Sequence, residues 1–443
     1  MTATYDYDLV VIGAGSGGLA AARQAAKLGK RVAIAEKADI GGTCVNRGCI
    51  PTKLMIYAAE FSKQQKIAGS YGWVNPEGLF DWPDFKQSMD DYIGSLRQTQ
   101  TENLEGIEIL RGEATFVDAH TLKIDKKTIT TEFVLIAVGS RPLMPDIPGI
   151  EHALTSRDIF QLETLPESFL IVGGGYIGVE FSQVLSSFGC RVTLVDSNPN
   201  VLNTFDKDIQ ERVKQILVND RVRVVDGARL KEIEEGTGTL IATLDNGWSL
   251  KAQKIFCALG RKANIDTLNL DAVGVTRKEN KIVVDAQGQT QESNIFAVGD
   301  CTDRMLLTPV AKAEAAVAVK AMFSDKKPQV DYFWIPSAVF MHPEVATVGL
   351  NEDDARQQHD SIETHCSEFT PLKYAMTSES PDAFIKLILQ QKSQKIIGIH
   401  LIAPRAVDIV QSLVPALEKG LTKDELDSTI GIHPSVGEEV FAL

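Results

Sequence analysis

The chain has 443 residues, too many for one hydrophobic core, so several domains are expected. With 45 basic and 59 acidic residues its formal net charge is -14, which disfavours nucleic acid and anionic membranes as partners. The chain has no apolar run of roughly 18 residues or more, so no transmembrane helix is expected. Its polar, acidic amino terminus lacks the basic segment of a signal peptide, and we expect a cytoplasmic protein with reduced cysteines.

The first motif is a glycine-rich turn between two predicted strands. Residues 8–13 are apolar and β-branched, which is typical of a buried parallel strand. A glycine-rich segment, an alanine-rich helix and a second strand that ends in Glu36 follow. This order is the fingerprint of a dinucleotide-binding unit, in which the acid binds ribose hydroxyls. The tight turn, the approach of the pyrophosphate and the close packing of helix on strand each need a glycine: Gly13, Gly15 and Gly18.

A cysteine pair, Cys44 and Cys49, follows directly after this fingerprint. In a regular helix, residues five apart differ by ~7.5 Å along the axis, whereas a disulfide needs Cα atoms within ~7 Å. A bridge here therefore needs a bent helix, which Gly48 would permit, and a strained bridge is easily reduced. Two unpaired thiols are the alternative. No second Cys or His pair lies at zinc-finger spacing, so no metal site is predicted.

The fingerprint occurs a second time in the middle of the chain. A helix is predicted at residues 83–104 and a buried strand at 133–139, and three prolines then mark a plausible domain boundary. The second fingerprint again consists of strand, glycines, helix and a strand that ends in an acid, Asp196. The interval from first glycine to acid is the same in both copies, so the chain is expected to bind two dinucleotides. The glycines of the second copy are Gly173, Gly175 and Gly178.

The last third of the chain has a different pattern. A strand at residues 294–300 ends in an acid, and the helix at 307–320 has a proline in its first turn. From about residue 331 no glycine fingerprint occurs. Apolar runs there predict an antiparallel sheet, and a helix is expected at residues 406–419. These runs begin at residues 338, 346, 384 and 396.

Together these motifs resemble the pyridine nucleotide–disulfide oxidoreductases with a CxxxxC centre, and the nearest subgroup is glutathione reductase. The motifs are GGTCVNRGCIPTK, the two GxGxxG units, AVGD at 297–300, LTPVA at 307–311 and the terminal HPSxxEE. The resemblance implies an α/β fold with two Rossmann-like dinucleotide-binding domains and an α+β C-terminal dimerisation domain. The expected parts are an FAD-binding domain (1–145), an NAD(P)H-binding domain (146–265), a return segment of the FAD domain (266–330) and the dimerisation domain (331–443).

The resemblance also implies a mechanism. Hydride from the nicotinamide reduces FAD, which passes two electrons to the Cys44–Cys49 disulfide. Cys49 is then the thiolate against the flavin, and Cys44 is the thiol that attacks the substrate disulfide. His433 is the expected acid–base group and Glu438 its orienting carboxylate. In the family this pair comes from the partner subunit, so the active site of the homodimer is completed across the interface. His342 is the alternative acid–base group.

Further residues take expected roles by the same resemblance. Lys53 and Glu180 pair near the flavin, Tyr176 covers its nicotinamide side, and Asp300 binds its ribityl chain. The remaining cofactor-binding residues are expected in the glycine-rich turns and at the strand ends: Gly13, Gly15, Ser16, Gly17, Gly18, Glu36, Gly42, Thr43, Gly139, Gly173, Gly175, Gly178, Asp196, Gly260 and Arg261.

The sequence departs from glutathione reductases at the reductant site. Relatives that use NADPH carry arginines after the second strand of the second fingerprint, where this chain has Ser197 and Asn203. Asp196 instead suits a free ribose diol and repels a 2′-phosphate. Gly178 also stands where such enzymes tend to have alanine. We therefore expect NADH to be preferred over NADPH.

The expected substrate site departs as well. Arg23 is retained at a position that binds a glutathione carboxylate in the family, but cationic or aromatic residues are replaced elsewhere. Because cations recognise carboxylates, their loss weakens recognition of glutathione disulfide. The departures are Gln24, Thr52, Gln100 and Ala316.

The sequence thus predicts an NADH-dependent reductase of a small disulfide, glutathione disulfide or a derivative of it. Dihydrolipoyl dehydrogenase is the first alternative, because it shares the cofactors and because Pro51-Thr52-Lys53 resembles the Pro-Ser-Lys pattern of that family. A mercuric-reductase core and a large thioredoxin reductase are less favoured, since both use a further C-terminal redox pair. A non-enzymatic flavoprotein would keep its function in a Cys44→Ser variant.

Overall fold

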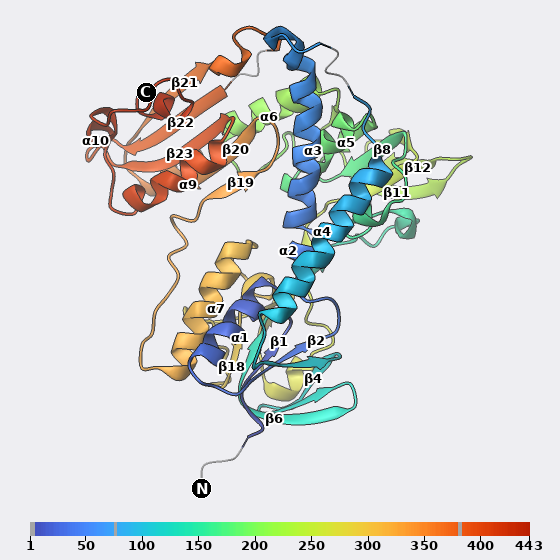
Figure 1. Cartoon of the computed structure of the whole chain (residues 1–443), viewed down its shortest axis with the longest axis vertical. Helices are drawn as coiled ribbons and strands as arrows, with labels where there is room; N and C mark the ends of the chain where they lie inside the picture. Colours follow the sequence, from blue (N-terminus) through green and yellow to red (C-terminus); the bar gives the residue numbers. More distant parts are fainter. Residues whose placement is uncertain (1–4, 75–77, 380–382) are drawn as a thin grey trace. The chain divides into compact units, whose positions relative to one another are not determined.

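The computed structural model describes residues 5–74, 78–379 and 383–443. It divides into two compact units, which are described separately (Figure 1). Unit 1 consists of Met1–Thr52, Pro83–Leu143 and Gly260–Val330, and unit 2 of Lys53–Trp82, Met144–Leu259 and Asp331–Leu443. Unit 2 thus includes a segment after the cysteine pair that the sequence analysis assigned to the first domain. Within the described ranges, no helix has the length and apolar character needed to cross a membrane.

Unit 1 is built on a parallel sheet with the strand order β3-β2-β1-β6, to which β18 adds beside β6. β4 and β5 extend this sheet in antiparallel fashion. The run VVI at the end of β1 is buried on both faces, as in a sheet covered on both sides. The strands are β1 (Tyr7–Ile12), β2 (Val32–Glu36), β3 (Glu108–Arg111), β4 (Ala114–Asp118), β5 (Thr121–Ile124), β6 (Lys127–Ile136) and β18 (Ile295–Ala297).

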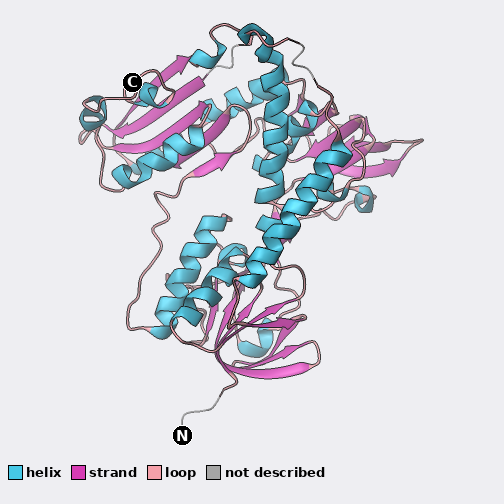
Figure 2. Ribbon diagram, viewed as in Figure 1, coloured by secondary structure: helices cyan, strands magenta, loops and turns pink. Residues whose placement is uncertain are grey.

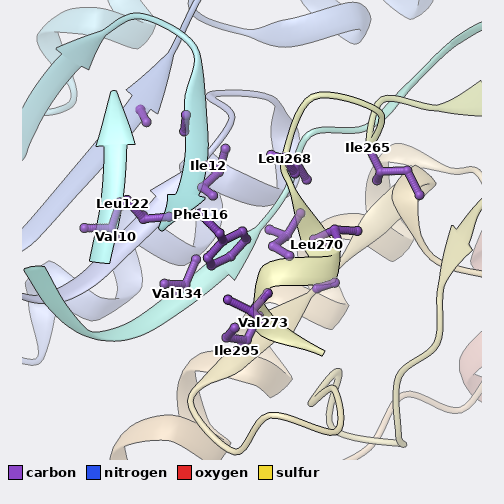
Figure 3. Packing of buried hydrophobic residues seen from close by; sticks show 14 of the residues in the cluster. Val10, Ile12, Phe116, Leu122, Val134, Ile265, Leu268, Leu270, Val273 and Ile295 are labelled. Carbon is purple, nitrogen blue, oxygen red and sulfur yellow. The ribbon is translucent and has the colours of Figure 1, made fainter. Parts of the chain in front are cut away.

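Two hydrophobic clusters cover the two faces of this sheet. On one face, α1 (Ser16–Lys27) and α7 (Thr308–Phe323) lie side by side, and their many alanines permit close contact (Figure 1). On the other face, Val10 and Ile12 pack with Phe116 and with the segment that contains Leu268 and Leu270 (Figure 3). Each large side chain buried in this way contributes roughly 1.5–3 kcal/mol of transfer free energy. The sheet therefore holds the ends of its strands in fixed positions.

Unit 2 contains a second parallel sheet, with the order β10-β9-β8-β14. It matches the second fingerprint, because α5 begins directly after the glycines that follow β8. An antiparallel sheet, β11-β12-β13, was not expected, since its strands are short and charged. The elements are β8 (Ser168–Val172), α5 (Tyr176–Ser187), β9 (Arg191–Val195), α6 (Lys207–Asn219), β10 (Arg223–Val225), β11 (Leu230–Glu235), β12 (Leu240–Leu244), β13 (Ser249–Ala252) and β14 (Lys254–Cys257).

The C-terminal part of unit 2 is the predicted antiparallel sheet, in the order β19-β20-β23-β22-β21. Helix α9 packs on β20 and β23, as Figure 2 shows. Strand β21 was not predicted, because its sequence IETHCSEF is largely polar. The elements are β19 (Ser337–Val339), β20 (Glu344–Gly349), α8 (Glu352–Gln358), β21 (Ile362–Phe369), β22 (Ala383–Gln390), β23 (Ile396–Ala403) and α9 (Ala406–Leu417). The predicted fold class, two parallel α/β sheets and an α+β C-terminal part, is confirmed.

Candidate active site

The first fingerprint of unit 1 forms a nucleotide site around Glu36. The two oxygens of this carboxylate accept hydrogen bonds from Ala14 N and Ala38 N, both at 2.7 Å. A Cβ atom on Gly18 would lie 1.9 Å from Gly13 O, so this glycine is required for the helix to pack on the strand. A pocket that is open to solvent lies beside Glu36. Its lining comes from the ends of three strands and from two further segments: Ile12, Gly13, Ala35, Glu36, Lys37, Gly112, Glu113, Ala114, Val138, Asn264, Thr267 and Leu268.

A second polar group of unit 1 lies at the ends of β6 and β18. Ser140 Oγ donates to Asp300 Oδ2 at 2.6 Å and accepts from Arg261 Nε at 2.7 Å. Arg261 also donates to Ser140 O at 2.8 Å, and its Nε lies 3.6 Å from the Asp300 carboxylate. The structure therefore brings Asp300 and Arg261 together through Ser140, which the sequence analysis did not single out. Gly139 and Gly260 precede this serine and this arginine.

The cysteine segment begins against the first fingerprint. Gly42 has a positive φ of 61°, and a Cβ on it would lie 2.6 Å from Gly15 Cα, so the two backbones touch. From there α2 (Gly42–Arg47) carries Cys44, and α3 (Cys49–Ala68) begins at the second cysteine. The helix is interrupted at Gly48, as the spacing of the pair predicted. Both cysteines are free thiols in this structure, which is the reduced form of the predicted redox pair.

The two thiols share one hydrogen-bond network. The hydrogen bond with Cys49, together with those from Thr308 and Ser16 and the positive charge of Lys312, outweighs burial and lowers the pKa of Cys44 to about 6. The hydrogen bond to Cys44 and burial raise the pKa of the Cys49 thiol far above its usual value. Cys49 Sγ also lies 3.7 Å from Thr308 Oγ1, at the start of α7. The pair thus retains one proton at neutral pH, and these shifts favour the negative charge on Cys44, whereas the sequence predicted Cys49 as the thiolate. A thiolate is the form that attacks disulfides.

In unit 2, Lys53 is held by a carboxylate other than the expected one. Its Nζ forms an ion pair with Glu344 Oε1 at 3.0 Å and lies 4.3 Å from the centroid of the Phe340 ring. Glu180 instead accepts a hydrogen bond from Phe340 N at 2.8 Å. Burial raises the pKa of Glu180 to about 8, against the opposing effects of this amide and of the Lys53 charge. The predicted Lys53–Glu180 pair is therefore replaced by a Lys53–Glu344 pair, with Glu180 close enough to interact electrostatically.

His433 and Glu438 are brought together as predicted. The Nδ1 atom of His433 lies 3.1 Å from both carboxylate oxygens of Glu438, and Glu438 Oε1 also accepts a hydrogen bond from Ser435 N at 2.9 Å. That amide is the first cause of the lowered pKa of the Glu438 carboxyl. Gly431 permits the tight loop, because a Cβ there would lie 2.8 Å from Glu438 Cβ. The His433 side chain is 83% exposed, so its Nε2 edge is available to a reactant.

The second fingerprint repeats the geometry of the first. Asp196 accepts hydrogen bonds from the backbone amides of Gly174 and Asn198, the latter at 2.6 Å, and from Asn198 Nδ2 at 2.8 Å. A Cβ on Gly178 would lie 1.8 Å from Gly173 O, so an alanine at Gly178 would force the turn to move. No described atom lies within 4 Å of the position that a Cβ on Gly175 would take. Tyr176, the first residue of α5, is exposed beside this glycine.

Comparison with known proteins assigns a family to this arrangement. Residues 7–315 match the family described as pyridine nucleotide-disulphide oxidoreductase, and residues 335–442 match its dimerisation domain. The chain belongs to this family. A glutathione reductase of Nostoc sp. is 37% identical over 98% of this chain and 99% of its own length. A glutathione reductase of Burkholderia cepacia is 34% identical over 99% and 98%.

Solved structures also include relatives of this pyridine nucleotide-disulphide oxidoreductase. The HOCl-induced flavoprotein disulfide reductase RclA from Escherichia coli matches with a TM-score of 0.90 and 27% identity, over 99% of both chains. The Cu(II) complex of the same reductase matches with a TM-score of 0.89. The chain is thus a flavin-dependent disulfide oxidoreductase close to glutathione reductase. Its dimerisation domain supports a homodimer, and its family implies FAD and a pyridine nucleotide as cofactors.

The residues of unit 1 fit FAD. The Glu36 carboxylate beside the pocket suits a ribose, and the Asp300 carboxylate suits a hydroxylated chain. Within the described residues, Arg47 Nε and Asn46 Oδ1 on α2 are buried without a hydrogen-bond partner, as at a site that a polar ligand completes. A Cβ atom on Gly15 would lie 3.9 Å from Gly42 Cα and near no other described atom, so the backbone of Gly15 is accessible to a ligand.

Two other predicted residues are engaged within the protein. The Arg23 guanidinium binds the C-terminal end of α4 (Trp82–Glu102), donating to Gln100 Oε1 at 2.6 Å, to Gln100 O at 3.2 Å and to Asn103 O at 3.3 Å. Its expected substrate carboxylate would have to replace these bonds. His342 Nε2 lies 2.8 Å from Tyr374 Oη, and burial lowers the pKa of His342 to about 3. A histidine that stays neutral in this way is a poor alternative to His433 as an acid–base group.

Four residues of the site were missed: Ser140, Thr308, Lys312 and Glu344. Thr308 lies within the LTPVA motif, and that motif was the available signal for it. Ser140 follows the predicted strand end at Gly139. Nothing local in the sequence points from Lys53 to Glu344, which lies 291 residues away.

Proposed function

We propose that this protein is an NADH-dependent flavoprotein that reduces a low-molecular-weight disulfide, with glutathione disulfide or a derivative of it as the first candidate. The observation that carries the proposal is the position of the Cys44–Cys49 pair, which begins against the first fingerprint, where Gly42 touches Gly15, with Thr308 Oγ1 3.7 Å from Cys49 Sγ. The relatives named glutathione reductase support the substrate class, and the relative named a flavoprotein disulfide reductase supports the reaction.

FAD, when bound, carries two electrons from a nicotinamide to the cysteine pair. Glu36 would hold its ribose, and the Asp300–Ser140–Arg261 group and the glycines of the first fingerprint would hold the rest of the cofactor. Lys53, Glu180 and Tyr176 are proposed to line the side of the cofactor that faces the nicotinamide. In this arrangement Glu344 fixes the Lys53 ammonium, while the buried Glu180 carboxyl, with its raised pKa, retains a proton at neutral pH.

The dithiol then reduces the substrate in two exchanges. The Cys44 thiolate attacks one sulfur of the substrate, forms a mixed disulfide and releases the other half as a thiolate. That thiolate takes a proton from His433, whose Nδ1 is held by Glu438. Cys49 next passes its proton to His433, which had given up its own, and attacks the Cys44 sulfur; this releases the second half as a thiolate and restores the Cys44–Cys49 disulfide. We propose that His433 comes from the partner subunit of the homodimer.

NADH is the proposed reductant because of the second fingerprint. Asp196 is fixed by three hydrogen bonds at the end of β9, where it suits a ribose diol and repels a 2′-phosphate. Ser197 and Asn203 supply no positive charge at the positions where relatives that use NADPH carry arginines. The specificity constant kcat/KM for NADH should therefore exceed that for NADPH, and the opposite preference would refute this part of the proposal.

The substrate is tested by a screen with the purified flavoprotein. NADH oxidation is followed with glutathione disulfide, its amide, lipoamide, cystine and Hg(II). The proposal expects fastest turnover with a glutathione-type disulfide. Preference for lipoamide, or binding to an acyltransferase core, would instead favour dihydrolipoyl dehydrogenase. The cytoplasmic location of the protein stays a prediction.

A further inference from the structure

Helix α7 presents its first turn to the dithiol. The helix begins at Thr308, whose hydroxyl lies 3.7 Å from Cys49 Sγ and also bonds to Cys44. In a helix, the residue four positions later lies on the same face, one turn further along. That residue is Lys312, so its side chain projects from the face of α7 that contacts the cysteines. The next acidic residue, Glu314, faces elsewhere, since it accepts a hydrogen bond from Gly299 N at 2.7 Å.

Lys312 is a cation whose charge is not neutralised within the described part of the protein. Its side chain is exposed, and among the described residues it has no ion-pair partner. The positive charge of Lys312 nevertheless stabilises the Cys44 thiolate, since this charge is one of the causes of the lowered pKa of Cys44. A lysine one helical turn from a residue that contacts the thiols, and not neutralised by the described part of the protein, is placed to meet an anionic group of a reactant.

The other cation expected at the substrate site is already bound. Arg23 donates three hydrogen bonds to the end of α4, and Ala316, one turn after Lys312 on α7, has no charge. A substrate with carboxylates near its sulfur atoms would therefore find its positive charge at Lys312. The lysine lies one helical turn from Thr308, so a carboxylate bound to it would stay close to the dithiol.

We infer that Lys312 binds a carboxylate of the disulfide substrate and orients its sulfur toward Cys44, so that small disulfides bearing carboxylates are preferred over neutral ones. This inference rests on the proposed disulfide reductase activity. Lysine acts here as a point charge on a flexible chain, which tolerates several carboxylate positions better than a bidentate arginine does.

The test compares the holoenzyme on two forms of one disulfide, glutathione disulfide and its fully amidated or esterified derivative, at saturating NADH. For the wild type we expect the ratio of kcat/KM, charged over neutral, to exceed one. In Lys312→Met this ratio should fall about tenfold or more, the range for losing a hydrogen bond to a charged group. Lys312→Arg should restore most of it, and Lys312→Glu should bring the ratio below one.

The matched control is Lys320→Met, an exposed lysine two turns further along the same helix, which should leave the ratio unchanged. The effect of Lys312 on Cys44 itself is measured apart, as the pH midpoint for alkylation of the reduced enzyme. An equal loss on both substrates in Lys312→Met would overturn the inference while leaving the reductase intact. Absence of wild-type turnover with either form would overturn the proposed function and the inference together.

Discussion

The two fingerprints hold their acidic residue in the same way but differ in what covers them. Glu36 and Asp196 each accept from an amide 22 residues earlier and from one two residues later. In unit 1 the cysteine segment lies against the middle glycine, with Gly42 touching Gly15. In unit 2 the space over Gly175 is open among the described residues.

This difference indicates a division of labour within one chain. In the proposed arrangement the first site lies against the segment that carries the dithiol, which suits a cofactor that stays bound and passes electrons on. A nucleotide in the second site meets an open turn, which suits a reductant that exchanges at every turnover. The same local motif would thus bind a retained cofactor in one place and an exchanging reductant in the other. The segment that follows the second strand distinguishes the two sites.

The largest expected effect comes from removing the nucleophile of the first site. Cys44→Ser should lower NADH-dependent disulfide reduction by more than about a thousandfold, as loss of a covalent nucleophile does. Bleaching of the flavin by NADH in an anaerobic stopped flow should persist, because the second site is untouched. Cys366→Ser, at an exposed cysteine of β21, serves as the control and should keep full activity. Full turnover in Cys44→Ser would contradict the assignment of the dithiol.

His433→Ala should cost roughly 10²–10⁴-fold in disulfide turnover, since a positioned acid–base group contributes that much. Mixing this variant with Cys44→Ser tests whether the site is shared. Mixed dimers contain one intact Cys44 and one intact His433 on opposite chains, so activity should return after subunit exchange. Two inactive parents that give an inactive mixture, with exchange proven by a mass tag, would place both groups in one chain.

Asp196→Ser should alter only the second site. We expect kcat/KM for NADH to fall about 10–100-fold, the range for a charged hydrogen bond to a ribose, while that for NADPH falls less or rises. Glu36→Ser is the matched change in the first site, and there loss of flavin on gel filtration is expected instead. If Asp196→Ser leaves the ratio of the two specificity constants unchanged, Asp196 does not determine the preference for NADH over NADPH.

The pH dependence of the dithiol is a smaller but direct effect. The pKa of Cys44 is lowered to about 6 from the ordinary thiol value, so its thiolate is present above that pH and lost below it. Alkylation of the reduced enzyme by iodoacetamide should therefore rise with a midpoint near pH 6. A midpoint near pH 9 would show that the network around Cys44 does not stabilise the charge.

The smallest expected effect concerns Lys53. Glu344→Gln removes an ion pair that is about three-quarters buried, and we expect a loss of about 1 kcal/mol in stability, measured by denaturant unfolding. Lys53 would then be free to approach Glu180, whose raised pKa should fall because a nearby cation favours the carboxylate. Glu352→Gln, in the separate cluster around Lys386, is a control that should leave Glu180 unaffected.

The contacts between site residues that lie close together in the chain could be predicted from the local sequence. The bonds of Glu36 and Asp196 follow from the strand–glycine–helix pattern, and His433 lies five residues from Glu438. The interruption at Gly48 followed from the spacing of the cysteines. Parallel sheets with apolar strands were also predictable, whereas β21 was not, because its sequence IETHCSEF is largely polar.

Groups that depend on distant packing could not be predicted. Both Glu180 and Glu344 could have paired with Lys53. The ammonium group of Lys53 lies near the rings of Tyr57 and Phe340 and forms its ion pair with Glu344. Arg23 was expected at the substrate because no sequence signal shows that the end of α4 takes its hydrogen bonds. The charge of Lys312 reaches Cys44 only because α7 begins at the dithiol.

The most direct test of the account is an anaerobic titration of the purified flavoprotein with NADH, followed by alkylation and mass mapping of the cysteines. The account predicts that one NADH per chain makes Cys44 and Cys49 newly reactive, and that a disulfide substrate then makes both unreactive again. Consumption of NADH that changes the flavin but exposes no new thiol at Cys44 or Cys49 would contradict it.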